Sequence, residues 1–99
     1  MQKETLFKIK VQKKLKEFGP HCWFFKTQQL ALLGIPDIIG VYHGKFFAFE
    51  LKKDSTSKPS RLQAWCLSAI SRAGGIAAVV HPDNLEQELR LLKYLTVVD

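Results

Sequence analysis

Apolar residues recur along this chain with two different spacings, and each spacing predicts a type of secondary structure. Residues 3–18 carry apolar side chains at intervals of four, four and three, which is the pattern of a helix with one apolar side. These side chains are Phe7, Val11, Leu15 and Phe18. Lys10, Lys13 and Lys14 fall on another side, and Gly19 and Pro20 end the helix.

Three strands are expected next, at residues 21–26, 38–42 and 46–52. Each segment is short and rich in aromatic or β-branched residues, as strands are. The sequence His-Gly-Lys at residues 43–45 suits a tight turn, so the second and third strands should form an antiparallel hairpin.

The rest of the chain predicts helix, strand and helix. A polar loop at residues 53–59 leads into a helix over residues 60–73, which two glycines end. Residues 76–81 read as a short buried strand. Residues 83–86 resemble a capping box that opens a last helix. The apolar side chains expected to face inward from this helix are Leu85, Leu89 and Leu92.

The order α-β-β-β-α-β-α predicts one α/β domain over residues 1–99, with a single mixed sheet flanked by helices. The strand at residues 76–81 returns after a helix, which implies a right-handed parallel crossover. Trp23 and Trp65 lie in apolar periodic segments, so both are expected in the core.

The amino-acid composition excludes several classes of protein. A hydrophobic fraction of 46% argues against disorder, and no apolar run approaches the roughly 20 residues that span a bilayer. The lysine-rich amino terminus is not laid out as a secretory signal. Cys22 and Cys66 are expected to be reduced core thiols of an intracellular protein. The formal net charge of +6 favours polyanionic partners, either nucleic acid or an acidic membrane surface.

Two charged residues interrupt the apolar strand at residues 46–52. Both faces of this strand begin apolar, which indicates burial on two sides, and Glu50 and Lys52 then share one face. A buried carboxylate is costly unless it is paired or bound to a metal. A partly solvated Glu50–Lys52 ion pair is one interpretation, and a metal ligand is the other.

Asp37 favours the metal interpretation. It follows Pro36 and begins the second strand, so the antiparallel hairpin should bring it close to Glu50 at the end of the third. Alone, Asp37 is a common turn-capping residue. Two adjacent carboxylates repel each other unless a cation lies between them, and hard oxygen ligands favour Mg²⁺ or Mn²⁺.

The spacing of Pro36-Asp37 and Glu50-Leu51-Lys52 resembles the motif of the PD-(D/E)XK nuclease superfamily. Residues 34–40 (Gly-Ile-Pro-Asp-Ile-Ile-Gly) and residues 60–63 (Ser-Arg-Leu-Gln) are similar to the VRR-NUC group, the virus-type replication-repair nucleases. The similarity runs from about Glu4 to the strand at residues 76–81. It implies a restriction-endonuclease-like fold and a viral or bacterial replication-repair setting.

The resemblance also implies two outlying site residues. Such nucleases carry an acidic residue on the first helix, for which Glu4 is the candidate, and Glu4 alternatively provides favourable charge in a first helical turn. They carry a glutamine on the helix after the motif, for which Gln63 is the candidate. Ser60 and Gln63 also have the spacing of a capping box, and the two roles are partly compatible.

The implied chemistry is hydrolysis of a phosphodiester bond. Asp37 and Glu50 would hold one or two Mg²⁺ or Mn²⁺ ions, with the backbone carbonyl of Leu51 a further ligand by resemblance. Lys52 would orient or deprotonate water, or stabilise the charged phosphorane. Asp37→Ala or Lys52→Ala should abolish cleavage with little loss of folding. No organic cofactor and no membrane are expected.

The expected substrate is DNA, cut according to its structure, because one small domain has no separate sequence-reading module. Branched DNA such as four-way junctions is the expected class, and symmetric cutting of two strands implies a homodimer. Phosphate contacts are expected from Lys26, Lys53, Lys58 and Arg61, each of which could instead be a solvated surface charge. The competing interpretations are a non-catalytic nucleic-acid-binding module with the same fold, and a structural protein.

Overall fold

The computed structural model describes residues 2–28 and 33–97. Its elements follow the predicted order, and their bounds differ from the predicted ones by at most two residues. They are α1 (Lys3–Lys16), β1 (Cys22–Lys26), β2 (Ile38–Tyr42), β3 (Lys45–Leu51), α2 (Arg61–Arg72), β4 (Ile76–Val80) and α3 (Leu85–Val97).

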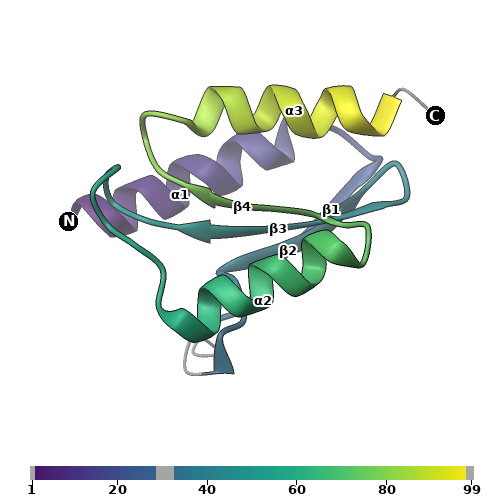
Figure 1. Ribbon diagram of the computed structural model, residues 1–99. Helices are drawn as coiled ribbons and strands as arrows, with labels where there is room; N and C mark the ends of the chain where they lie inside the picture. The colour runs from purple at the N-terminus through teal and green to yellow at the C-terminus, as the bar shows by residue number, and fades with distance from the viewer. Residues whose placement is uncertain (1, 29–32, 98–99) are drawn as a thin grey trace.

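The four strands form one mixed sheet in the order β1-β2-β3-β4. The two pairs β1–β2 and β2–β3 are antiparallel, and β3–β4 is parallel, as the crossover through α2 predicted. Helices α1 and α3 lie along one face of the sheet and α2 lies along the other (Figure 1). The predicted α/β fold with helices on both faces is therefore confirmed.

The main core lies between the sheet and the pair α1 and α3. Strand β3 is buried from Phe47 to Leu51, as expected of a strand covered on two sides. Its alternate residues Phe47, Phe49 and Leu51 join the core on this face. The buried residues that the two helices contribute are Phe7, Val11, Leu15, Leu85, Leu89 and Leu92.

The other face of the sheet is only partly covered, because α2 packs against β3 and β4. The prediction that Trp23 and Trp65 lie in the core is wrong, since 62% of Trp23 and 64% of Trp65 is exposed. Period-two alternation shows which side chains share a face of a strand. It does not show whether a helix covers that face.

Two glycines, one in β2 and one just before it, allow neighbouring atoms to approach the backbone closely. A Cβ at Gly40 would lie 2.5 Å from the Trp23 carbonyl oxygen and 2.6 Å from the Phe47 ring. Gly34 has φ +80°, and a Cβ there would lie 2.7 Å from both Cγ and the carbonyl oxygen of Leu62. The chain that leads into β2 therefore rests directly on the first turn of α2.

The connection from β4 to α3 differs from the predicted capping box. The side chain of Asn84 accepts a hydrogen bond from the His81 N–H at 2.8 Å and donates one to the Val79 carbonyl at 3.0 Å. Asn84 thus holds the end of β4 against the start of α3. Cys22 and Cys66 form no disulfide with each other, as expected, but both are half-buried rather than fully buried in the core.

Within residues 2–28 and 33–97, none of the helices combines the length and the apolar character needed to cross a bilayer.

Candidate active site

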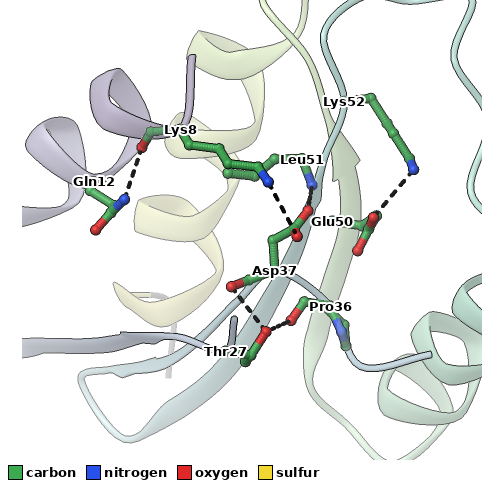
Figure 2. Close-up of polar contacts among 8 residues, drawn as sticks. All are labelled: Lys8, Gln12, Thr27, Pro36, Asp37, Glu50, Leu51 and Lys52. Carbon is green, nitrogen blue, oxygen red and sulfur yellow. Dashed lines mark hydrogen bonds and ion pairs between the residues drawn. The ribbon is translucent and has the colours of Figure 1, made fainter. Parts of the chain in front are cut away.

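The candidate site lies where β2 begins and β3 ends. The last paired residues of the hairpin are Ile38 and Phe49, so continuing the register by one step sets Asp37 opposite Glu50. Figure 2 shows both side chains at this end of the sheet, and the charge of Asp37 is one cause of the raised pKa of Glu50.

Pro36 explains why the side chain of Asp37 turns toward β3. One further step in the register sets Pro36 opposite Leu51, but proline has no N–H to donate to the ladder. The carbonyl of Pro36 accepts a hydrogen bond from Thr27 Oγ1 at 2.7 Å. The Leu51 N–H instead donates to Asp37 Oδ2 at 2.7 Å, so a side chain takes the position of the next ladder acceptor (Figure 2).

The regular geometry of a strand directs the carbonyl of Leu51 toward the same site. Within a strand, the N–H and C=O of one residue point to the same side. The Leu51 N–H points to Asp37, and the carbonyl therefore points to the same edge. In a regular ladder the N–H of the residue at position 36 would donate to the Leu51 carbonyl oxygen, but Pro36 has no N–H. This oxygen is therefore not used by the ladder and could serve as the predicted main-chain metal ligand.

Thr27, just beyond the end of β1, holds the backbone of this turn. It is 7% exposed, and its N–H donates to the Asp37 carbonyl at 2.9 Å. Its hydroxyl lies 2.7 Å from the Pro36 carbonyl and 3.2 Å from that of Asp37. No pattern along the sequence indicates this residue, since its role depends on a contact between two strands.

Glu50 is the most unusual side chain of the site. It is 2% exposed, and its Oε2 lies 3.4 Å from Lys52 Nζ. Its Oε1 is buried and has no hydrogen-bond partner among the described residues. Burial, and then the nearby charge of Asp37, raises the pKa of Glu50 to about 7, although Lys52 acts in the opposite direction.

The Glu50–Lys52 ion pair expected from the sequence is therefore present, but it accounts for only one carboxylate oxygen. A buried polar atom without a partner costs free energy that a simple structural ion pair would not demand. The ion pair and the metal interpretation are compatible, because they use different oxygens of Glu50.

Helix α1 adds a charged residue that the sequence patterns did not indicate. Lys8 Nζ lies 4.0 Å from Asp37 Oδ1, and Figure 2 shows this side chain reaching the site from α1. Glu4 lies in the first helical turn and is exposed, as the alternative interpretation expected. It stands one turn before Lys8 on the same side of α1, so its role as the acidic site residue stays a prediction.

Gln63 forms the capping box that its spacing predicted. The Gln63 N–H donates to Ser60 Oγ at 3.1 Å, and the Ser60 N–H donates to Gln63 Oε1 at 2.9 Å. Gln63 is 7% exposed, on the side of α2 that faces the sheet. Since its amide oxygen is used by the cap, an active-site role would fall to its amide NH₂ group, and that role stays a prediction.

The donor set fits a divalent cation. Among the described residues there is no group of three or more His, Cys, Asp and Glu side chains that could hold a metal. Asp37 and Glu50 are two carboxylates, and Mg²⁺ is commonly held by one or two carboxylates while it keeps several waters. A cation between them would satisfy Glu50 Oε1 and reduce the repulsion that raises the pKa of Glu50.

The predicted phosphate contacts lie on several elements around this end of the sheet. Lys26 is half-buried and ends β1, directly before Thr27. Lys53 lines an open cavity of about 440 Å³ together with Lys3 and Lys10 of α1. The remaining two, in the segment between β3 and α2 and at the start of α2, are exposed; they are Lys58 and Arg61. The structure thus brings Lys53 together with part of the basic surface of α1.

No family model, curated protein or solved structure matches the chain. Its function is therefore inferred from the geometry of the site.

Proposed function

We propose that this chain is a divalent-metal-dependent nuclease that hydrolyses DNA phosphodiester bonds, of the PD-(D/E)XK type and the VRR-NUC group. One observation carries the proposal. Glu50 is buried beside a second carboxylate and has an oxygen without a partner, while Lys52 holds its other oxygen. Buried carboxylates with strongly raised pKa values are typical of functional sites.

Asp37 and Glu50 hold the cation in this proposal, and the carbonyl of Leu51 offers a third oxygen. When bound, Mg²⁺ or Mn²⁺ supplies Lewis acidity to the phosphodiester and to water. Asp37 serves with Oδ1, because its Oδ2 already accepts the Leu51 N–H. That hydrogen bond fixes the side chain before any ligand arrives, which reduces the ordering cost of binding.

Lys52 supplies positive charge next to the carboxylates. Its ammonium group lies beside Glu50 Oε2, where it orients water or stabilises the charge that develops on the phosphorane. Lys8 supplies a second ammonium group, next to Asp37 Oδ1. Both lysines lower the repulsion that an incoming phosphate meets at two carboxylates.

DNA is the proposed substrate because the net charge is +6 and basic side chains surround this end of the sheet. Phosphate contacts are assigned to Lys26, Lys53, Lys58 and Arg61. Branched DNA such as four-way junctions is the proposed substrate class, cut by two copies of the chain. Two cuts placed symmetrically need two active sites related by a two-fold axis.

A cleavage assay on Glu50→Gln and Asp37→Asn tests the proposal. Both variants remove a charge and keep the size of the side chain, and the amide in Asp37→Asn retains an oxygen that can accept the Leu51 N–H. Asp37→Ala is less suitable than the sequence suggested, because it would leave this N–H without its acceptor and is expected to cost about 1–3 kcal/mol of stability. A suitable control is Glu86→Gln, which removes an exposed carboxylate of α3.

Cleavage that needs Mg²⁺ or Mn²⁺, is retained by Glu86→Gln and is lost in both site variants would support the proposal. Full cleavage by Asp37→Asn and Glu50→Gln would overturn it. Binding of DNA without cleavage of any substrate would favour a non-catalytic binding module instead.

A further inference from the structure

A small hollow lies between the polar loop at residues 53–59 and the end of β4, and we name it the loop pocket. Its volume is about 200 Å³, below the roughly 300–1,000 Å³ of pockets that take small organic ligands. The residues that line it are Ser55, Ser57, Lys58, Pro59, Val79 and His81. Of these, only Lys58 has a place in the proposed function.

The loop pocket adjoins the candidate site. Val79 pairs with Glu50 across the parallel strands β3 and β4, and continuing this register by two steps sets His81 opposite Lys52. The Lys52 N–H donates to the Val80 carbonyl at 2.9 Å, so the ladder extends to this point. Val79 and His81 therefore stand on the face of the sheet that carries Glu50 and Lys52.

The polar groups that line the pocket suit an anion. Two are serine hydroxyls, one is the ammonium group of Lys58 and one is the imidazole of His81, and among the described residues no carboxylate lines it. The larger cavity beside Lys53 differs, because Asp54 and Asp83 line it as well. A small hollow with several donors and no acidic group matches a phosphate group.

A hydrogen bond fixes the tautomer of the His81 ring. The Asp83 N–H donates to Nδ1 at 3.2 Å, so the neutral ring carries its proton on Nε2 and can donate there. The backbone is held as well, since the His81 N–H donates to Asn84 Oδ1 at 2.8 Å. The imidazole is thus prepared as a hydrogen-bond donor before any ligand arrives.

Asp54 holds the loop on the other side of the pocket. Its Oδ1 accepts hydrogen bonds from the N–H and hydroxyl groups of both Thr56 and Ser57, at 2.7–3.0 Å. The loop passes around the end of the sheet where β3 and β4 finish (Figure 1). Since the Ser57 hydroxyl is used within the loop, Lys58 and His81 are the main donors that remain for a ligand.

We propose that the loop pocket binds a backbone phosphate of the DNA strand that is cut, next to the phosphate that is hydrolysed. The proposed cation lies between Asp37 and Glu50, before and in the paired strands β2 and β3, and the pocket lies at β4. Neighbouring strands are about 4.8 Å apart, so roughly 7 Å or more separates the pocket from the cation, too far for one phosphate to reach both. Lys52 stands between them. This inference rests on the proposed function and adds His81 to its DNA-binding residues.

Inorganic phosphate tests the pocket without DNA, metal or catalysis. The chain has three histidines, so the ring signals of His21, His43 and His81 can be followed together by NMR at fixed pH and ionic strength. The His81 signals are expected to shift saturably, and Lys58→Gln should weaken this binding about 10-fold or more. Equal shifts for all three rings, or no response of His81 up to about 100 mM phosphate, would overturn the pocket.

Neutral linkages test the contact with DNA. The phosphates on either side of the cleavage position are replaced one at a time by methylphosphonate, which removes the charge. One of these replacements should slow single-turnover cleavage by the wild type about 10-fold, because the pocket loses its anion. His81→Leu and Lys58→Gln should each cut normal DNA about 10-fold more slowly, and the same replacement should slow them less than about twofold further.

His21→Leu is the matched control, since His21 is exposed and stacks on His43 in the turn at the other end of the sheet. It is expected to keep the wild-type rate and the wild-type response to methylphosphonate. His81→Gln retains an N–H donor and should cut faster than His81→Leu. A full methylphosphonate effect in both His81→Leu and Lys58→Gln would overturn the proposal, because their loss of rate would then be structural.

The two experiments separate this inference from the proposed function. Saturable phosphate binding at His81 in a chain that cuts no DNA would support the pocket as a phosphate site and contradict the nuclease. Metal-dependent cleavage that no neighbouring methylphosphonate slows would contradict the phosphate contact and leave the nuclease standing.

Discussion

The two faces of the sheet are covered to different extents, and they serve different purposes. On one face, α1 and α3 together bury a continuous apolar core. On the other, the single helix α2 packs on β3 and β4 and leaves apolar side chains of β1 and β2 exposed, among them Trp23, Phe25 and Val41. The Glu50–Lys52 pair lies on this same side of the sheet. The better covered face holds the main apolar core, and the partly covered one carries the Glu50–Lys52 pair.

Strand β3 belongs to both faces and shows the contrast residue by residue. Phe49 and Leu51 point into the apolar core, and Glu50 between them points to the α2 side. Because both neighbours of Glu50 along the strand are anchored in the core, its backbone is held rigidly. A carboxylate placed on such a strand has a well-defined position, which is what metal binding requires.

The largest expected effect of breaking this contrast is on catalysis. Glu50→Gln should lower the rate of metal-dependent cleavage by about 10³-fold or more, because it removes a charged ligand while the neighbouring core stays intact. Single-turnover kinetics with Mn²⁺ measures the cleavage rate, and circular dichroism checks that the variant keeps its fold. A rate within about threefold of the wild type would contradict it.

The second-largest expected effect is on the free energy of unfolding. Replacing a phenylalanine by alanine can be compared on the two faces of the sheet. Phe49→Ala should lower the free energy of unfolding by about 3–5 kcal/mol, since Phe49 is fully buried. Phe25→Ala makes the same change where 52% of the ring is exposed, and about 1 kcal/mol or less is expected for the monomer. Urea denaturation at low protein concentration compares them, and equal losses would show that the faces do not differ.

The pH dependence of stability sharpens the contrast further. The pKa of Glu50 is raised to about 7 in the folded chain, above its ordinary value of 4.5, so protonation favours the fold. Its contribution is complete below about pH 4.5 and is lost as the pH rises through 7. Between about pH 6 and pH 8, the metal-free wild type should lose about 1 kcal/mol that Glu50→Gln does not lose.

Bound metal should reverse this trend. A cation binds the ionised carboxylate, so Mn²⁺ should raise the melting temperature more at about pH 8 than at about pH 6. The same titration of Glu50→Gln is expected to show a much smaller rise. A Mn²⁺ effect that is equal at both pH values and in both proteins would place the cation elsewhere.

The smallest expected effect concerns the charges around the site. Replacing Lys58 and Arg61 by glutamine should weaken DNA binding and lower the slope of log affinity against log salt by about one for each phosphate that is no longer bound. Fluorescence anisotropy over a salt series measures it. The matched control replaces Lys16 and Arg90, which are exposed on α1 and α3. An equal change in both double variants would mean that Lys58 and Arg61 have no specific contact.

The fold was predictable from the sequence because the helical and strand spacings of apolar residues depend only on residues close together in the chain. The helical stripe of α1 and the hairpin of β2 and β3 follow from residues close together in the chain. The approach of Asp37 to Glu50 was predictable for the same reason, since the turn between them sets the register. Pro36 indicated where the hydrogen-bond ladder between the second and third strands ends, because proline has no N–H to donate.

The features that the sequence did not predict all depend on how distant elements pack. Lys8 reaches Asp37 from α1, at the start of β2, and Thr27 holds the backbone of Asp37 from the end of β1. The exposure of Trp23 and Trp65 depends on how much of the sheet α2 covers. The pattern of apolar residues along a strand or helix does not show whether another element covers that side chain. An exposed tryptophan therefore lies in the same kind of local sequence as a buried one.

The most direct test of the central claim is a cleavage assay on labelled single-stranded, duplex, flap and four-way junction DNA. Wild type and Glu50→Gln are each run with Mg²⁺, Mn²⁺ or EDTA. We predict that the wild type cuts branched DNA only when a divalent cation is present, and that Glu50→Gln binds the same DNA without cutting it. Cleavage in EDTA, or equal cleavage by Glu50→Gln, would contradict a catalytic metal held by Asp37 and Glu50.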